Sequence, residues 1–393
     1  MAPTVPVDLN PSLLVWARET AGLDHEEAAK KLGISLGKLL ACERGDDTLS
    51  LAQLRKAANV YKRSLGVFFL SEPPYTPPLL PDFRGLRDYN QSNYSSSLRF
   101  EIRHSRYRRK LALELCEELD FSPEPFEITA KLSENPEDVG RRIREWLGIT
   151  FEQQKSWSST YESLNSWLLC LESRFVLVFQ TKEVERDEML GACIHYDVLP
   201  VIILNGKYHP NSKVFTLMHE LAHLAVGESG VSSENSIDSP NTEGDISFLE
   251  QFCNHVAGEI LLPTRELNRL IDSEGYNQIG DSELNQISKV FGVSREVALR
   301  RLRHSDRISY SAFNDILAGI RREYVKYKSS DKKPNGGPPY HKMVVRDNGL
   351  LFTRLVCEAF ESSKISPSAF SSYLDVNLKH ADKIINDISG RAS

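Results

Sequence analysis

Apolar positions recur at helical spacing through most of the chain, and short β-branched runs interrupt this pattern only in the middle. Between residues 11 and 70, five short stretches each place apolar residues on one helical face. Gly22, Gly33 and Gly45 follow three of them, where glycine favours the end of a helix. The pattern predicts a bundle of five helices, over residues 11–23, 25–34, 36–45, 50–61 and 63–70.

A proline-rich segment ends this bundle. Five prolines, at positions 73, 74, 77, 78 and 81, prevent regular structure and favour a semi-rigid extended linker. Helical patterning then returns from residue 96 to residue 148, in a stretch rich in arginine. The first domain boundary is therefore expected inside the proline-rich segment.

Two β-branched runs follow, RFVLVFQ at 174–180 and LPVIILNG at 199–206, with a weaker strand candidate, MLGACIHYD, between them. They predict a small sheet directly before an apolar helix that ends at Gly227. Residues 228–245 then form a Ser/Asn/Gly-rich stretch without Lys or Arg, which predicts a long surface loop. Its acidic residues would favour a basic partner if it served as a lid or a substrate selector: Glu228, Glu234, Asp238, Glu243 and Asp245.

The remaining chain is predicted to be helical. One helix ends at Pro263, two more flank a Gly-Val-Ser turn within residues 281–304, and a Pro/Gly-rich linker precedes a helical tail. The fold class expected is multidomain and mainly α, with an α+β domain in the middle. The expected boundaries are 1–72 for the N-terminal bundle, 73–95 for the linker, 96–328 for the α+β domain with its core at 160–305, 329–342 for the second linker and 343–393 for the tail.

The composition is that of an ordinary globular protein, and the net charge of the whole chain gives no reason to expect a polyanionic partner. It has 393 residues, 40% hydrophobic, and a formal net charge of −6. The six cysteines include no Cys-x-x-Cys pair, which argues against a disulfide framework. With no secretory signal and no apolar run long enough to span a bilayer, a cytoplasmic protein without a membrane partner is expected.

Three polar side chains interrupt the apolar helix in KVFTLMHELAHLAVG, residues 213–227. His219 and His223 lie four residues apart, so a helix points both imidazoles at one place, where neutral imidazole is a good zinc ligand. Glu220 projects beside them and can take a proton from a water molecule. A surface helix with two histidines is the alternative, but apolar residues surround the motif, and buried ionisable groups need partners or a metal.

A catalytic zinc of this type needs a third protein ligand, and the helix over residues 247–263 offers three candidates. Glu250 ranks first, Cys253 second and His255 third, because His255 points away from the face of the other two. Cys253 is better explained as a buried packing residue. Asn254 shares the face of Glu250 and is a candidate to accept a hydrogen bond from a ligand histidine.

These residues predict one zinc ion per chain and hydrolysis of a peptide bond, with Glu220 as the general base. The strand within LPVIILNG lies just before the helix in sequence. It can pair with an extended substrate by strand addition, or it can simply belong to the core.

FTLMHELAHL, preceded by PVIILN and followed by EQFCNHVAGEILLP, resembles the ImmA/IrrE metallopeptidases over residues 160–305. The resemblance implies a zincin-like fold for the α+β domain, in which His219, His223 and Glu250 bind zinc and Glu220 is the catalytic base. It also implies a substrate: a repressor of the helix-turn-helix kind, cut to relieve transcriptional repression in stress or mobile-element responses.

The N-terminal stretch EEAAKKLGISLGKLLACERG resembles an XRE-like, lambda-repressor-type helix-turn-helix. Its candidate contacts to DNA or to a partner are Ser35, Lys38 and Arg44. Residues 12–72 hold nine Lys/Arg against eight Asp/Glu, which supplies little attraction for phosphates. DNA binding, homodimerisation and docking of the target repressor therefore remain alternative roles for this domain.

Two arginine-rich helices, over residues 99–110 and 295–303, are more basic, and they are either solvated faces or phosphate contacts. For the whole chain, the alternative to a protease is a transcriptional regulator whose metallopeptidase fold senses a ligand or a partner. A role in a toxin–antitoxin or mobile-element system is a further alternative. Glu220 argues for the protease, because a site without catalysis needs no base beside the metal.

Overall fold

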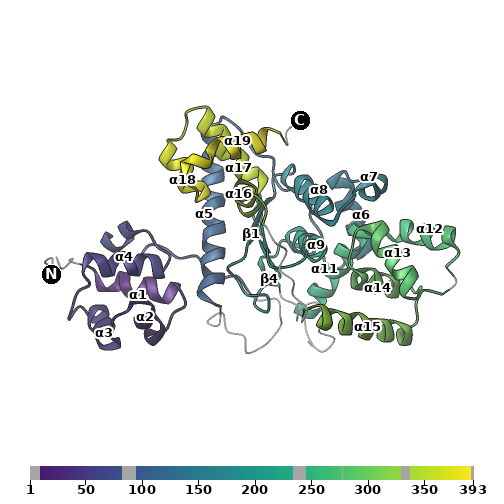
Figure 1. The fold of residues 1–393 in the computed structure, drawn as a ribbon, viewed down its shortest axis with the longest axis horizontal. Helices are drawn as coiled ribbons and strands as arrows, with labels where there is room; N and C mark the ends of the chain where they lie inside the picture. The colour runs from purple at the N-terminus through teal and green to yellow at the C-terminus, as the bar shows by residue number, and fades with distance from the viewer. Residues whose placement is uncertain (1–8, 82–93, 233–244, 277, 329–336, 391–393) are drawn as a thin grey trace. The chain divides into compact units, whose positions relative to one another are not determined.

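A computed structural model describes residues 9–81, 94–232, 245–276, 278–328 and 337–390 (Figure 1). Among them, one compact unit holds the chain up to Leu80 together with residues 94–104, and a second holds Pro81 and everything from Ser105 onward. The division falls inside helix α5, Ser96–Glu118. The predicted class, mainly helical and multidomain with one small sheet, is confirmed.

The first unit begins with five short helical elements, as predicted. Asp24, Ser35 and Ser50 each accept a backbone N–H at a helix N-terminus. Gly33 and Gly45 adopt positive φ of 68° and 85° at helix ends, a conformation that favours glycine. The last element is a 3-10 helix and not an α-helix. The elements are α1 Pro11–Thr20, α2 His25–Leu32, α3 Leu36–Arg44, α4 Leu51–Val60 and η1 Leu65–Phe69.

The second unit contains a four-stranded mixed sheet in the order β1-β3-β2-β4. β1 pairs in parallel with β3, whereas β2 is antiparallel to both β3 and β4. Every strand residue is buried, which explains the continuous β-branched runs. The strands are β1 Leu177–Thr181, β2 Gly191–Ile194, β3 Val201–Asn205 and β4 Gly230–Ser232.

The structure corrects one prediction about this region and decides between two alternatives for another. The stretch 228–245 does not begin as a surface loop, because Gly230–Ser232 is the buried strand β4, too short for a β-branched run to reveal. The rest of that acidic loop, 233–244, lies outside the described residues. The strand in LPVIILNG is β3, and β1 and β2 cover both of its edges, so strand addition there is excluded and its role is core packing.

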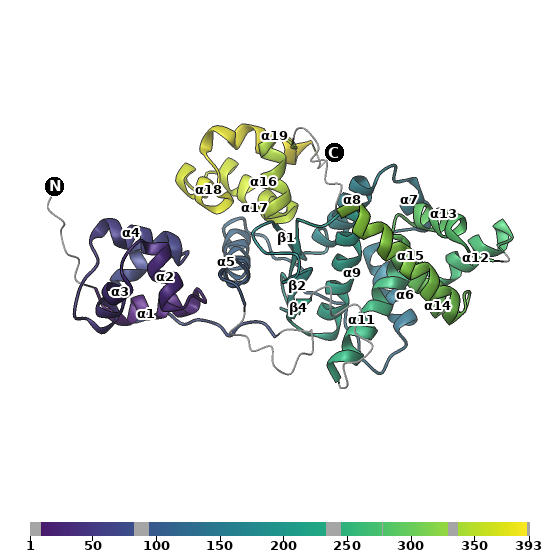
Figure 2. The same cartoon turned by 60° about the horizontal axis from the view of Figure 1, so that its bottom comes forward.

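Helices pack on this sheet and on one another to form the main core. α9, Pro210–Val226, contacts β2, β3, α8 and α11 (Figure 2). The helix α11, Asp245–Leu261, packs between α9 and α6. The other helices around this core are α6 Pro136–Leu147, α7 Phe151–Ser156, α8 Thr160–Glu172, α12 Thr264–Glu274, α13 Asp281–Phe291, α14 Arg295–His304 and α15 Tyr310–Lys328.

The C-terminal tail packs on the same unit, against α8 and β1. The Glu172 carboxylate accepts the N–H of Leu351 at 3.0 Å, and a Cβ on Gly349 would clash with Val178 O. The tail comprises α16 Tyr340–Asn348, α17 Leu350–Glu361, α18 Pro367–Leu374, η3 Leu378–His380 and α19 Ala381–Ser389. Within the parts of the chain that the structure describes, no helix is both long enough and apolar enough to span a bilayer.

Candidate metal centre

The helix α9 carries the His-Glu-x-x-His motif through the centre of the second unit. It begins with Pro210 after the His209 N-cap and ends at Gly227, whose φ is 87°. His219 is 2% exposed, and Glu220 and His223 are fully buried. The surrounding apolar residues pack against β2, β3, α8 and α11, so the three polar side chains are shielded from solvent.

The helix α11 brings Glu250 to the two histidines. His219 Nε2 lies 3.4 Å from Glu250 Oε2, and His223 Nε2 lies 3.1 Å from Glu250 Oε1. The two Nε2 atoms are 3.0 Å apart. Glu250 is itself only 4% exposed. His219, His223 and Glu250 thus form a buried group that can hold a metal ion.

The spacing of these atoms fits zinc. Ligand atoms about 2.0–2.1 Å from a tetrahedral zinc ion lie about 3.3 Å from one another, close to the three separations observed. Two imidazole nitrogens and one carboxylate are also a frequent ligand set of catalytic zinc, which leaves a fourth position open. Neither oxygen of Glu250 has a partner with good hydrogen-bond geometry in the described structure, as expected of a ligand rather than of a member of a hydrogen-bond network.

The protonation of each side chain in the metal group depends on the charges of the other two. Burial acts to lower the pKa of His219, but the Glu250 carboxylate outweighs it and the net pKa is raised. Burial lowers the pKa of His223 to about 4. The pKa of Glu250 falls to about 2 because both histidines oppose the effect of burial. His223 is therefore held neutral and Glu250 ionised, the forms in which these side chains ligate metals.

Glu220 lies against β2 and β4. A Cβ on Gly191 would be 2.8 Å from Glu220 Oε1 and 2.5 Å from Thr216 Cγ2, so glycine lets the helix approach the strand. Burial raises the pKa of Glu220 to about 7, although the charge of His219 and the nearby Ser232 hydroxyl and Cys193 thiol act to lower it. A carboxylate with a pKa near neutrality is suited to exchange protons at neutral pH.

Asn254 lies next to His219, as its position one turn after Glu250 predicts. Its side chain raises the pKa of His219 by hydrogen bonding. The buried Asn254 Oδ1 and His219 Nδ1 atoms nevertheless lack a partner with good hydrogen-bond geometry in this part of the structure. A small side-chain adjustment would let the amide oxygen accept the Nδ1–H and orient the imidazole.

The two lower-ranked ligand candidates do not join the group. Cys253 is fully buried in the apolar core between α9 and α11, as expected of a packing residue. His255 turns to the other side of α11, where its Nε2 contacts His304 Nε2 from α14, with ring centroids 3.9 Å apart. The ranking of the three candidates by helical face therefore agrees with the geometry.

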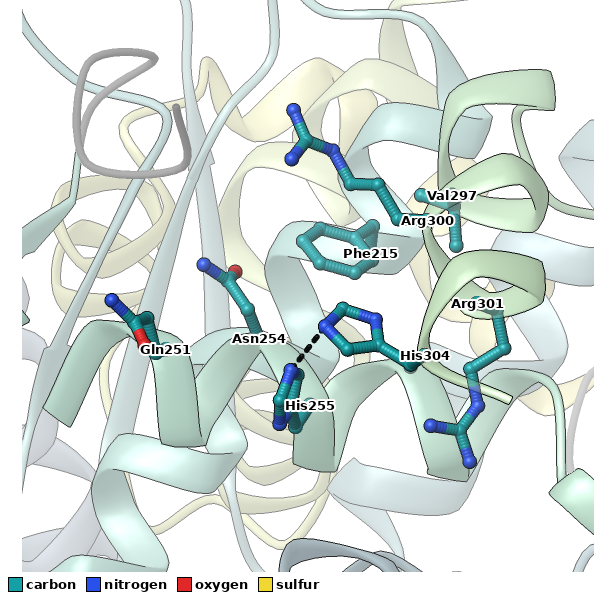
Figure 3. Close-up of a pocket in the computed structure, with 9 residues that line it drawn as sticks. Phe215, Gln251, Asn254, His255, Val297, Arg300, Arg301 and His304 are labelled. Carbon is teal, nitrogen blue, oxygen red and sulfur yellow. Dashed lines mark hydrogen bonds between the residues drawn. The ribbon is translucent and has the colours of Figure 1, made fainter. Parts of the chain in front are cut away.

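A cavity of about 270 Å³ is lined by residues of α9, α11 and α14, among them two neighbours of His219, and Figure 3 shows its lining. Asn254 lines it from α11, and Phe215 lines it from α9, with its ring centroid 6.3 Å from that of His219. Arg300, Arg301 and His304 line it from α14, and burial lowers the pKa of His304 and that of His255, the latter to about 4, so the two imidazoles are neutral. The pattern of the sequence revealed neither this cavity nor the roles of Gly191 and Ser232, because each depends on strands and helices that only the tertiary fold brings together.

The candidate contacts on the helix-turn-helix are occupied by local interactions. Ser35 caps α3, accepting the N–H of Lys38 at 3.2 Å. Lys38 pairs with Asp47 at 3.3 Å, and Arg44 pairs with Asp46 at 2.8 Å. Both cations are thus partly neutralised by acids at the end of α3.

Several arginines of the two basic stretches are buried or bonded within the protein, which neither alternative drawn from the sequence expected. In the first, Arg108 is 4% exposed over the Phe179 ring, and Arg109 donates to Val198 O and Leu199 O. In the second, Arg301 is 4% exposed and contacts Glu259. Sequence patterning treats arginine as exposed, whereas these guanidinium groups hold helices to their neighbours.

Comparison with known families agrees with this geometry. Residues 180–303 match the IrrE N-terminal-like domain of the M78 peptidases, and residues 13–66 match a helix-turn-helix domain. No curated protein matches the chain significantly. Both resemblances noted in the sequence are confirmed: the chain carries a metallopeptidase domain with a buried His219/His223/Glu250 group, and an N-terminal helix-turn-helix domain. The first implies a protein substrate and the second suggests DNA binding.

Proposed function

We propose that this chain, with its IrrE N-terminal-like and helix-turn-helix domains, is a zinc-dependent regulatory endopeptidase that cleaves a partner transcription repressor. The observation that carries the proposal is the convergence of His219, His223 and Glu250 with Glu220 beside them. A metal-holding structural site would not need a buried carboxylate of raised pKa next to its ligands.

In the proposed mechanism His219, His223 and Glu250 hold the ion and Asn254 orients His219. Zinc, when bound, lowers the pKa of a coordinated water and polarises a carbonyl. Glu220 accepts a proton from the attacking water as the new C–O bond forms. It then donates that proton to the amide nitrogen as the C–N bond breaks, so the products are a carboxylate and an amine.

The cavity shown in Figure 3 is the proposed position of a substrate side chain next to the scissile bond. Its volume of about 270 Å³ is enough for one large side chain. The neutral imidazoles of His255 and His304 and the guanidinium of Arg300, which pairs with Glu296, offer hydrogen-bond donors, so a polar side chain is the best match. Phe215 and Val297 cover the apolar part of such a side chain.

The N-terminal domain is proposed to bring the enzyme to its substrate, either on DNA or by docking the repressor itself. The pairing of Lys38 with Asp47 and of Arg44 with Asp46 favours docking, because it reduces the charge available to phosphates.

The test is to incubate the purified protein with the repressor encoded beside its gene. Wild type is expected to cleave the repressor at one site, and Glu220→Gln is expected to retain about one zinc per chain without cleaving. Cleavage by neither protein, with zinc present in both, would favour the alternative function, a regulator that senses a ligand or partner. Equal cleavage by both would exclude Glu220 as the base.

A further inference from the structure

A second cavity, of about 400 Å³, lies between the C-terminal tail and the beginning of α9. The helices α8, α9, α16 and α17 and the strand β1 all contribute to its wall. Figures 1 and 2 both show the tail helices beside β1. Four cations line the cavity, Lys182, Lys213, Lys342 and Arg346, against one carboxylate, that of Glu172. This wall is therefore strongly positive.

Lys213 is buried in this wall, with an exposure of 7%. Its ammonium group has three donors, and one of them bonds to the amide oxygen of Gln180 at 3.0 Å. No carboxylate among the described residues lies within ion-pair distance of Lys213. A buried ammonium with no described carboxylate in ion-pair distance is costly, so an anion in the cavity would stabilise its charged form.

The pKa of Lys213 reflects the lack of a close negative charge. Burial lowers it most and the charges of Arg346 and Lys182 add to the shift, so that the pKa falls to about 8 although Asp347 acts to raise it. An anion in the cavity would oppose this shift, because it would favour the protonated ammonium.

The other charges of the wall do not neutralise one another. Arg346 pairs with Asp347 at 2.6 Å, but Lys182 and Lys342 form no ion pair with any carboxylate that the structure describes. The Glu172 carboxylate is 5% exposed and accepts the Leu351 N–H, which ties it to the tail. The lining thus keeps an excess of positive charge.

We propose that this cavity binds a small molecule carrying a phosphate group, held jointly by Lys213, Lys342 and Arg346. A phosphate group suits the site because it carries more than one negative charge and several acceptor oxygens, which several cations in the wall of one cavity can share. The aliphatic residues Leu168, Val345 and Leu350 also line the cavity and can cover a less polar part of the ligand.

The ligand would connect the tail to the helix that carries the metal group. Lys342 and Arg346 belong to α16, whereas Lys213 belongs to α9, about 9 Å along the helix axis from His219. Binding is therefore expected to stabilise the packing of the tail on this unit. The site needs no peptidase activity, so its test is independent of the proposed function.

The experiment measures binding of inorganic phosphate and of adenosine 5′-monophosphate to the full-length protein, by calorimetry and by thermal unfolding. Binding of either probe is expected to raise Tm beyond the effect of sodium chloride at equal ionic strength. Lys213→Met and Lys342→Gln are each expected to weaken binding about tenfold, the effect of one lost charged hydrogen bond. Lys342 is exposed, so Lys342→Gln tests the site even if Lys213→Met folds poorly.

Two controls separate this cavity from other anion sites. Lys364→Gln changes an exposed tail lysine outside the cavity and is expected to bind like wild type. His219→Ala is expected to retain binding, because it alters the metal group alone. Stabilisation by sodium chloride equal to that by phosphate, wild-type affinity in Lys342→Gln, or loss of binding in His219→Ala would each overturn the proposal.

Discussion

Gly191 on β2 lies directly against Glu220 on α9, so that a Cβ at position 191 would be 2.8 Å from Glu220 Oε1. The same Cβ would be 2.5 Å from Thr216 Cγ2 one turn earlier. The distance between the strand and the helix, and with it the position of the carboxylate relative to the two histidines, therefore depends on the absence of a side chain at residue 191.

Gly191→Ala is expected to displace Glu220 while leaving the metal ligands in place. Overpacking of this kind costs about 1–3 kcal/mol in the free energy of unfolding. We expect metal content near that of wild type, a loss of cleavage of at least about tenfold and a lower midpoint in urea. Gly319→Ala on α15 is the matched control, since a Cβ there meets nothing within 4 Å. Full activity in Gly191→Ala would show that Glu220 is not positioned by this contact.

Metal binding distinguishes the three candidates for the third ligand. Glu250→Ala is expected to lose zinc after dialysis against a weak chelator, because only two ligands remain. Cys253→Ala and His255→Ala are expected to retain about one zinc per chain, since neither side chain joins the group. Zinc should raise the Tm of the last two variants and not that of Glu250→Ala. Retention of zinc by Glu250→Ala would transfer the role of ligand to another residue.

Asn254→Ala tests the orientation of His219. Loss of a partner of this kind typically lowers metal affinity or activity 10–100-fold, and we expect an effect in this range. Asn254→Asp keeps an acceptor oxygen at the same place and should restore most of the zinc affinity. Competition with a chromogenic chelator measures the zinc affinity of each variant and of the wild type. Equal affinities in all three proteins would mean that the amide packs beside His219 without orienting it.

Lys213 gives stability a distinct dependence on pH. Its pKa is lowered in the folded protein to about 8 from 10.5, so the burial cost is fully present below pH 8, where both states are protonated. Between pH 8 and 10.5 the folded state loses the proton first, and its stability rises by up to about 3 kcal/mol. Lys213→Met should abolish this rise in phosphate-free buffer and be more stable at pH 7. The exposed Lys364→Met should titrate like wild type, and a rise that persists in Lys213→Met would assign it to another group.

The sequence alone predicted the candidate site residues whose arrangement depends only on their spacing within one helix. His219, Glu220 and His223 share one helix, and Glu250 and Asn254 share a face of the next, so the helical period alone placed each set. Sequence could not reveal features that require two distant segments to meet. Gly191 against Glu220, β4 beside β2, and Lys213 with Lys342 each join residues whose separation follows no period. The burial of arginines in the basic helices could not be predicted for a related reason. The residues next to a buried arginine such as Arg108 in the sequence show the same pattern as those next to an exposed one.

The acidic partners at the end of α3 are expected to limit DNA binding by the N-terminal domain. Replacing Asp46 and Asp47 together with Asn would release Arg44 and Lys38. If these cations then contact phosphates, the affinity for duplex DNA should rise and the slope of log K against log salt should steepen by about two. A variant with Glu26→Gln and Glu72→Gln removes two exposed acids elsewhere in the domain and changes the net charge equally. Fluorescence anisotropy over a salt series compares them. An equal gain in this control would assign the effect to overall charge, and no gain in either variant would favour docking of the repressor as the role of this domain.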